Sequence, residues 1–231
     1  MLDFSRFSVL SFDCYGTMID WEAGIFSALR PILAAHNKRV SDATVLSMYS
    51  ELEAEAEQGD YVRYHDVLRR VVQGFGERLG FAPSQAEEDS LPNSLANWKP
   101  FGDTVESLKK LQVRYKLAVI SNIDDDLFAF TAPKLGLKFD HVITAEQSRC
   151  YKPCKRIFQI AQARLAVKAE NWLHVGQSIY HDVIPAQAIG VKTVWVSRPS
   201  PRAGGATKVV EGKPDLEVKS LRELADLAEN S

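Results

Sequence analysis

Cysteine is scarce in this sequence, and its scarcity excludes several kinds of protein. The 231 residues contain three cysteines, an odd number without the spacing of a disulfide framework. Such usage is typical of a reducing compartment, so we expect a cytoplasmic location. Cys150 and Cys154 flank Lys152, but two thiols without further ligands at metal-binding spacing do not make a zinc site. We therefore expect no bound metal and interpret both thiols as packing residues.

Long apolar runs and a strong net charge are also missing. No apolar run approaches the roughly 20 residues that a membrane-spanning helix needs, and the run after Arg6 is too short for a signal peptide. A formal net charge of −2 provides no basic surface for nucleic acid or for a membrane. Hydrophobic residues make up 45% of the chain, as in ordinary globular proteins. We expect neither nucleic acid nor a membrane as a partner.

Two rhythms of secondary structure divide the chain. Residues 7–12 form an apolar run that predicts a buried strand, and the next 80 or so residues show helical spacing only. The helices predicted there span 21–36, 42–58, 64–79 and 85–97. After residue 98, helices over 104–113, 127–135, 157–165 and 182–189 alternate with strands over 116–121, 141–144, 172–175 and 193–196. A Gly- and Pro-rich loop is predicted over 199–213 and a closing helix over 220–227.

The alternation of strands and helices indicates the fold class. Strands joined by helices of this length predict right-handed crossovers and a parallel sheet covered on both faces. We therefore expect an α/β fold, in which residues 1–17 and 98–231 form a Rossmann-like core domain. Residues 18–97 would be an inserted all-α cap domain. An insertion directly after the first strand is well placed to cover a crevice and to exclude water from it.

Asp13 follows the first predicted strand, and Gly16 comes three residues later. Ligands of open parallel sheets bind beyond the carboxyl ends of the strands, so Asp13 is expected to face a crevice. We interpret Asp13 as a nucleophile. The alternative is a loop aspartate that caps the next turn, which is the commoner role of an isolated Asp after a strand.

Further polar residues follow three of the later strands. They are Ser121 with Asn122, Lys152 before Pro153, and Gly176-Gln177-Ser178 with Asp182. These groups are spaced by about 30 residues, roughly one βαβ unit, so they should meet at one edge of the sheet. Taken singly, they have plainer interpretations as an N-cap, a solvated lysine and a first-turn aspartate. Together they place a nucleophile, a hydroxyl, an amide, a cation and a second carboxylate in one crevice.

These groups resemble the four motifs of the haloacid dehalogenase superfamily. The matching segments are residues 12–17 (FDCYGT), 121–122 (SN), 151–153 (YKP) and 175–178 (VGQS), the last followed by Asp182. The helical insertion after the first motif is similar to the cap of that superfamily. The resemblance covers essentially the whole chain.

Two positions set this chain apart from the phosphatases of the superfamily. Phosphatases carry a general acid two residues after the nucleophile, where this chain has Tyr15, a group with an ordinary pKa of about 10. They also hold Mg²⁺ with an Asp after the glycine of the fourth motif, where this chain has the neutral Gln177. A departing halide needs neither a proton nor a metal. The sequence therefore resembles the L-2-haloacid dehalogenase branch, which works without a cofactor.

The resemblance also implies a reaction and a role for each residue. Asp13 would attack the halogen-bearing carbon of a small 2-haloacid, and water would hydrolyse the resulting ester to a 2-hydroxy acid. Lys152 would keep Asp13 ionised, and Asp182 would orient or activate the water. Thr17 and Ser121 would hold the nucleophile and the substrate carboxylate. The residues expected to contact the substrate are Cys14, Tyr15, Arg63, Asn122, Gln177 and Ser178.

The predicted cap departs from that branch. Its members place an Arg on the second cap helix to receive the halide, but residues 48–57 contain no Arg and are strongly acidic. Arg63 is the candidate that the sequence offers in its place. Phe158 stands six residues after Lys152, where the branch has Tyr. The aromatic residues of the region would line an apolar pocket or pack in a core: Trp21, Tyr61, Tyr64 and Trp98.

Two other classes of function stay open. One is a Mg²⁺-dependent phosphatase of small phosphate esters, and the other is a non-catalytic protein that has kept the fold. A serine hydrolase is disfavoured, because Tyr180 stands where the nucleophile elbow after Ser178 needs a small residue. His174 and His181 flank that serine, and we expect both to serve packing. Members of the family are often homodimers, so the resemblance also allows a homodimer.

Overall fold

A single parallel sheet organises the molecule. The computed structural model describes residues 2–198 and 210–231. In this part of the chain the strands lie in the order β3-β2-β1-β4-β5-β6, and every neighbouring pair is parallel. The strands are β1 (Val9–Phe12), β2 (Lys116–Ser121), β3 (His141–Thr144), β4 (Trp172–Gly176), β5 (Lys192–Val196) and β6 (Leu216–Val218). The predicted α/β class is confirmed.

The strand order reverses next to β1, and this reversal positions the site. The chain runs from β1 outward through β2 to β3, and then returns to the other side of β1 to form β4. In open α/β sheets, the connections on either side of such a reversal leave a crevice at the carboxyl ends of the strands. Residues that follow β1, β2 and β4 are therefore brought to one place.

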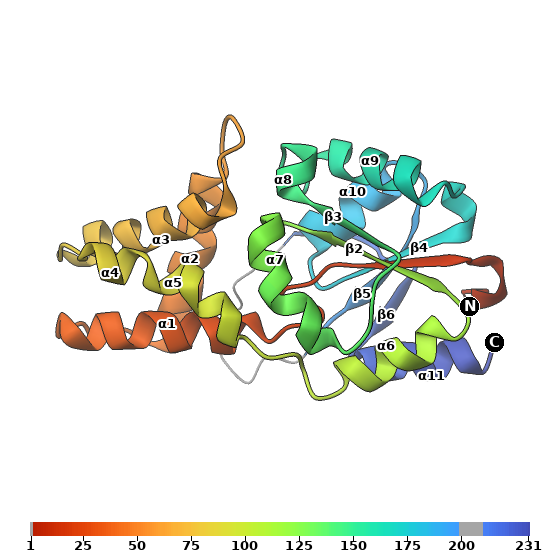
Figure 1. Ribbon diagram of the computed structural model, residues 1–231, viewed down its shortest axis with the longest axis horizontal. Helices are drawn as coiled ribbons and strands as arrows, with labels where there is room; N and C mark the ends of the chain where they lie inside the picture. The colour runs from red at the N-terminus through yellow and green to blue at the C-terminus, as the bar shows by residue number, and fades with distance from the viewer. Residues whose placement is uncertain (1, 199–209) are drawn as a thin grey trace.

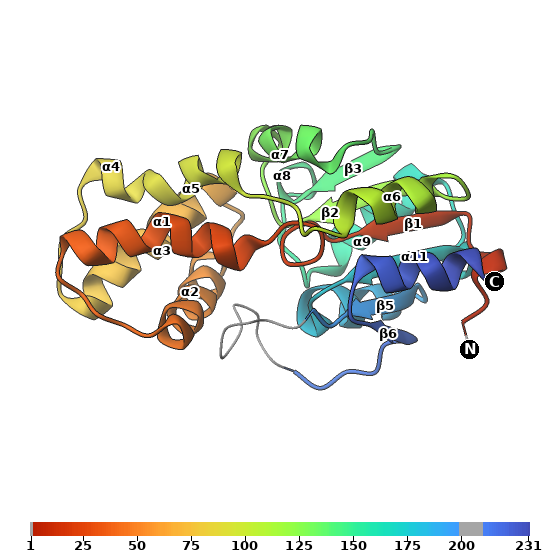
Figure 2. The same ribbon diagram turned by 90° about the horizontal axis from the view of Figure 1, so that it is seen from below.

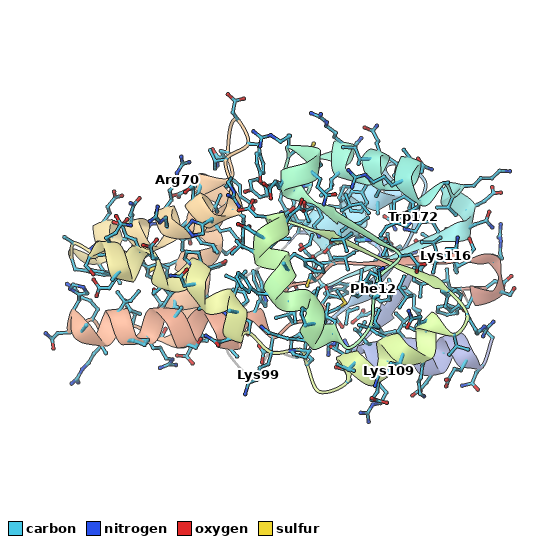
Figure 3. The ribbon with its side chains drawn as sticks, viewed as in Figure 1. Phe12, Arg70, Lys99, Lys109, Lys116 and Trp172 are labelled. Carbon is cyan, nitrogen blue, oxygen red and sulfur yellow. The ribbon has the colours of Figure 1, made fainter. Side chains whose placement is uncertain are left out.

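Helices cover both faces of the sheet (Figures 1 and 2). One face packs against α6 (Thr104–Gln112) and α11 (Leu221–Glu229), and the other against α9 (Lys155–Leu165) and α10 (Ile184–Gln187). Leu10 and Phe12 belong to the first layer of apolar side chains and Val9 to the second, because successive strand residues point to opposite faces. Figure 3 shows Phe12 and Trp172 in the interior, while Lys109 projects outward.

The helices of residues 18–97, called the helical segment below, lie together at the end of the molecule away from both termini (Figure 1). They are α1 (Trp21–Ala35), α2 (Asp42–Ala56), α3 (Tyr64–Leu79), α4 (Gln85–Glu88) and α5 (Ser90–Ser94). Ser41 caps α2 by accepting from the Thr44 N–H, and α3 ends before Gly80, whose φ is +69°. No helix among the described residues has both the length and the apolar character to cross a bilayer.

Several elements differ from the sequence prediction. The helix expected over 85–97 is broken into α4, α5 and a 3₁₀ turn, and Pro92, which has no N–H to donate, lies inside this stretch. The helix expected over 182–189 is a π-helical turn (Ile179–Val183) followed by α10. Strand β6 and the short helix α8 (Ala145–Ser148) were not predicted, and the helix expected over 127–135 is α7 (Asp125–Thr131) followed by a 3₁₀ turn (Ala132–Leu135). The loop predicted over 199–213 lies outside the described residues up to 209.

Candidate active site

The Asp13 carboxylate stands directly after β1 and is held from two sides. Thr17 Oγ1 donates to Oδ2 at 2.7 Å, and Lys152 Nζ donates to Oδ1 at 2.7 Å. The turn between Asp13 and Thr17 passes through Gly16, whose φ of +91° lies in the left-handed region that side chains disfavour. This turn folds Thr17 back onto Asp13, so the carboxylate is fixed before any ligand binds.

The Lys152 ammonium lies between two carboxylates. Its Nζ is 2.7 Å from Asp13 Oδ1, 2.6 Å from Asp182 Oδ1 and 3.1 Å from the Ile120 carbonyl oxygen. An ammonium has three hydrogens, so all three are used by these acceptors. Burial alone would lower the pKa of Lys152, but the two carboxylates outweigh it and raise that pKa above its ordinary value. Lys152 therefore stays charged.

The two carboxylates beside Lys152 ionise differently. Burial raises the pKa of Asp13 above its ordinary value; Lys152 counteracts this effect and the charge of Asp182 adds to it. Burial also opposes ionisation of Asp182, but Lys152 and a hydrogen bond from His174 hold the pKa of that carboxyl well below its usual range. Asp182 is thus a permanent anion, and Asp13 is the group that titrates.

The backbone around Asp182 brings its carboxylate close to the end of β4. The π-helical turn that carries Asp182 places Oδ2 at 3.2 Å from the Ser178 N–H, which donates to it. A Cβ on Gly176 would lie 2.5 Å from the Asp182 carboxyl carbon, so a side chain at position 176 would displace the carboxylate. Gly176 therefore serves close approach here.

A buried chain of polar groups supports Asp182 from behind. An ionised carboxylate only accepts, so His174 Nε2 donates to Asp182 Oδ1 across 3.3 Å. His174 Nδ1 lies 2.7 Å from Ser11 Oγ, and Ser11 Oγ accepts a hydrogen bond from Trp172 Nε1 at 2.7 Å. The sequence prediction assigned His174 to packing and gave Ser11 and Trp172 no role. The signal that was missed is their spacing: Trp172 and His174 are two residues apart in one strand, so their side chains lie on the same face of the sheet.

Ser121 and Asn122, both at the end of β2, differ in their hydrogen bonds. The Ser121 hydroxyl is buried, lines the pocket and has no hydrogen-bond partner among the described residues. Asn122 instead holds the backbone of Lys152: its Oδ1 accepts from the Lys152 N–H at 2.7 Å, and its Nδ2 donates to the Lys152 carbonyl at 3.2 Å. The structure thus places Asn122 where it positions Lys152, although Asn122 also lines the pocket.

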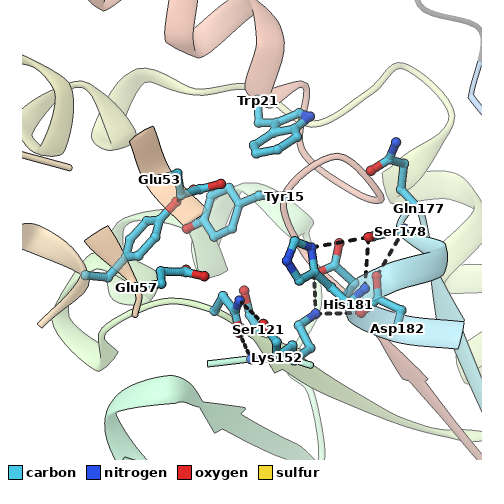
Figure 4. A pocket seen from close by; sticks show the side chains of 13 residues that line it. Tyr15, Trp21, Glu53, Glu57, Ser121, Lys152, Gln177, Ser178, His181 and Asp182 are labelled. Carbon is cyan, nitrogen blue, oxygen red and sulfur yellow. Dashed lines mark hydrogen bonds and ion pairs between the residues drawn. The ribbon is translucent and has the colours of Figure 1, made fainter. Parts of the chain in front are cut away.

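These side chains surround a pocket between the sheet edge and the helical segment (Figure 4). A water-sized sphere can reach about 50 Å³ inside it, so the pocket is small in this structure. The lining residues are Asp13, Tyr15, Trp21, Glu53, Glu57, Tyr64, Ser121, Asn122, Lys152, Gln177, Ser178, His181 and Asp182. Of these, the sequence prediction left Glu53, Glu57 and His181 out of the site.

The helical segment contributes two carboxylates to this pocket. Glu53 Oε1 accepts from Tyr64 at 2.5 Å and from Tyr49 at 3.0 Å. Burial raises the pKa of Glu53 to about 7, although the two hydroxyls oppose this effect. Burial and the neighbouring charge of Glu53 raise the pKa of Glu57 well above its ordinary value. The signal in the sequence was the four-residue spacing, which puts both side chains on one side of a helix.

Asp124 fastens the helical segment to the sheet domain. This fully buried carboxylate accepts from the backbone N–H groups of Tyr64 and His65, each at 3.0 Å, and from the Tyr61 hydroxyl at 2.8 Å. Those N–H groups belong to the first turn of α3, which lacks a capping side chain of its own. A residue from outside the helical segment therefore supplies the N-terminal cap of α3.

Two predicted substrate contacts lie elsewhere in the structure. Arg63 pairs with Asp126 Oδ2 at 2.7 Å and with Asp124 Oδ2 at 3.4 Å, and its side chain is 46% exposed. It does not belong to the pocket lining, which argues against Arg63 as the group that receives a halide. The Cys14 side chain is fully buried among apolar residues and also lies outside the lining. The prediction chose both residues by their position in the sequence, which does not show where their side chains point.

The other predicted contacts line the pocket. The Tyr15 hydroxyl lies 2.8 Å from Thr131 Oγ1, within hydrogen-bonding distance. Burial raises the pKa of Tyr15 well above its ordinary value. The Gln177 N–H donates to Thr17 Oγ1 at 2.9 Å, and the Ser178 hydroxyl accepts from the His181 N–H at 3.0 Å. The first bond ties the turn after β1 to the turn after β4, and the second holds the turn after β4 itself.

The side chains present do not fit a Mg²⁺ site. In residues 2–198 and 210–231, no group of three or more His, Cys, Asp or Glu side chains is arranged to hold a metal ion. Lys152 lies between Asp13 and Asp182, and Gln177 offers an amide where a carboxylate would suit a hard cation better.

Comparison with known proteins assigns the family. A model described as haloacid dehalogenase-like hydrolase matches residues 7–190. The chain belongs to the haloacid dehalogenase-like hydrolases. It is 25% identical over 228 residues to an (S)-2-haloacid dehalogenase of Pseudomonas sp. (strain YL), covering 96% of this chain and 94% of the relative. A glyceraldehyde 3-phosphate phosphatase of Methanocaldococcus jannaschii is 31% identical over 140 residues, covering 57% of this chain and 58% of that protein.

Solved structures of the family share the fold over the full length. The L-2-haloacid dehalogenase of Xanthobacter autotrophicus with chloropropionic acid covalently bound matches with a TM-score of 0.80 at 19% identity. That match covers 96% of this chain and 98% of the other. A likeness at this identity shows the common architecture, including the helices inserted after the first strand of this hydrolase.

Proposed function

We propose that this hydrolase is a 2-haloacid dehalogenase that displaces halide with Asp13. The observation that carries the proposal is the environment of Asp13: a carboxylate anchored by Thr17 and Lys152, with no carboxylic acid two residues further on. That position holds Tyr15, whose hydroxyl bonds to Thr131. The site is suited to a leaving group that departs as an anion without a proton. The (S)-2-haloacid dehalogenases among the relatives support the same reaction.

The reaction would proceed in two steps. An Asp13 carboxylate oxygen attacks carbon 2 of the substrate, the carbon–halogen bond breaks, and the halide leaves with the electron pair. Water then adds to the side-chain carbonyl carbon of the ester, the acyl–oxygen bond breaks, and a 2-hydroxy acid and one proton are released. Asp13 has by then exchanged one oxygen with the solvent.

The surrounding residues would divide the remaining work. Lys152 keeps Asp13 oriented and offsets its charge, and Ser121 donates its unpartnered hydroxyl to the substrate carboxylate. Asp182 orients the water and Lys152; its low pKa makes it a poor proton acceptor, so we assign it to positioning. Residues 18–97 act as the cap that encloses the pocket. The homodimer and the cytoplasmic location stay proposals that rest on the resemblance and on the cysteine content.

The decisive experiment is a single turnover in heavy-oxygen water with enzyme in excess over 2-chloropropionate. We expect one heavy oxygen in the Asp13 side chain and none in the product, read by mass spectrometry of the peptide and of the acid. An Asp13→Asn variant should lose at least about 10³-fold in halide release. Label in the first-turnover product would overturn the mechanism.

A second measurement separates this reaction from that of the phosphatases. Halide release from chloro-, bromo- and fluoroacetate is followed with excess chelator present. Full activity under chelation is expected, because the proposed steps use only side chains. Halide release abolished by the chelator, or turnover of small phosphate esters with Mg²⁺ alone, would assign the chain to the phosphatases instead.

A further inference from the structure

The charges that line the pocket do not match a simple 2-haloacid anion. Four carboxyl groups face it, from Asp13, Glu53, Glu57 and Asp182, and the described lining includes no arginine. Its lysine, Lys152, already donates to three acceptors. An anionic group at the far end of a substrate would therefore meet carboxyl groups on the helical-segment side, with no cationic side chain there to receive it. An apolar far end would make no polar contact with these carboxyl groups.

The pocket has two chemically different sides. On the sheet side, the Ser121 hydroxyl is buried and unpartnered among the described residues, so it is available to donate to a carboxylate. On the opposite side, Glu53 and Glu57 face the pocket together, as Figure 4 shows, with Asp182 across from them. One side suits an acidic group and the other a hydrogen-bond donor or a cation.

Aromatic rings accompany the two glutamates. Trp21 and Tyr64 line the pocket beside them, and the Trp21 ring packs edge-on against Tyr49 with a centroid separation of 5.9 Å. Tyr49 and Tyr64 also fix Glu53 by hydrogen bonds. Carboxyl groups beside aromatic rings can recognise an ammonium group, through the charge of the ionised carboxylate and through cation–π attraction.

We propose that the substrate is a zwitterionic 2-haloacid, whose carboxylate bonds to Ser121 and whose far end carries an ammonium group held by Glu53 and Glu57. This inference rests on the proposed function for its chemistry, and on the pocket lining for its specificity. The two glutamates are specificity-determining residues: they contact the far end of the substrate and take no part in bond breaking.

The turnover experiment compares two substrates that differ only at the far end, 2-chlorobutanoate and 4-amino-2-chlorobutanoate, with a longer pair built on the hexanoate chain. The amino member is expected to have a kcat/KM at least about tenfold higher, since one charge contact of this kind is worth about that factor. Glu53→Gln and Glu57→Gln should each reduce the preference. Glu55→Gln is the control, because Glu55 is exposed on the same helix and pairs with Arg78 outside the pocket.

A binding measurement separates failure of this inference from failure of the proposed function. Calorimetry compares butanoate with 4-aminobutanoate, which carry no halogen. Tighter binding of the amine that is lost in the Gln variants supports ammonium recognition even if no haloacid is turned over. Equal binding of butanoate and 4-aminobutanoate, or a preference for the amine that survives in both Gln variants, overturns it, whether or not a haloacid is turned over. Unchanged melting temperatures of the isosteric variants show that they fold.

Discussion

Lys152 is the residue on which the other charges of the site depend. Two buried carboxylates share its ammonium, and Asn122 holds its backbone in place. Breaking a buried ion pair by removing one partner costs about 3–5 kcal/mol, because a buried charge is left unpaired. The sequence pointed to Lys152 through its position after a strand. It could not show that Asn122 acts on Lys152, since that depends on the path of two loops.

The titration of Asp13 predicts how activity depends on pH. Because burial raises the pKa of Asp13 and protonation removes its nucleophilic oxygen, kcat should fall as pH is lowered, with a midpoint above the ordinary Asp value of about 4. The profile is measured by halide release in the wild type and in Glu53→Gln. The same acid limb in both proteins assigns it to Asp13; a limb that disappears in Glu53→Gln contradicts this assignment.

Glu53 predicts a second pH effect, on binding rather than on chemistry. Burial raises the pKa of Glu53 to about 7, so this group gains its negative charge as pH rises through neutrality. The groups that face it are the hydroxyls of Tyr49 and Tyr64 and the carboxyl of Glu57. Affinity for 4-aminobutanoate should therefore increase between about pH 6 and about pH 8. Calorimetry at both pH values checks this, and Glu53→Gln should flatten the dependence; an affinity that declines over the interval contradicts it.

At the scale of elements, α3 shows what pattern can and cannot predict. Its C-terminal end was predicted because Gly80 stops the helix by adopting a left-handed conformation. Its cap was not, because the capping carboxylate of Asp124 lies 60 residues away in the sequence from Tyr64. Strand β6 was also missed, since three residues with an exposed Glu217 give no periodicity. Local signals predict where an element ends, and tertiary partners decide how it is held.

Removing the Asp124 cap should loosen the helical segment. Asp124→Asn keeps the size of the side chain but leaves one of the two α3 N–H groups with a poorer acceptor. The free energy of unfolding should fall by about 1–3 kcal/mol, and kcat and KM should change together. Urea denaturation and steady-state kinetics measure both quantities. Asp126→Asn is the control, because its exposed pair with Arg63 is worth less than about 1 kcal/mol. Equal behaviour of the two variants would contradict this role.

At the scale of the whole molecule, the helical segment and the sheet share one apolar interior. The same cluster of buried side chains contains Leu29 and Phe75 from the helical segment and Phe12 and Leu117 from the sheet. The sequence separated the two regions by their rhythm of secondary structure. It could not show that their apolar side chains meet, because that contact forms only after the chain folds.

This shared interior predicts cooperative unfolding. Scanning calorimetry should record one transition, with equal calorimetric and van't Hoff enthalpies, because neither region can expose its side of the cluster alone without cost. Two separate transitions, or an Asp124→Asn variant in which only part of the helical signal melts first, would show that the regions unfold independently.

The cap that Asp124 gives to α3 also has a kinetic consequence. If the helical segment moved away from the sheet, the first turn of α3 would lose its acceptor, and the buried carboxylate of Asp124 would lose its backbone donors at the same time. A partly opened state would leave the N–H groups of α3 and the Asp124 carboxylate unpaired before water could replace their hydrogen bonds. We therefore expect opening of the segment to be a two-state motion, detectable as exchange between two positions on the μs–ms timescale.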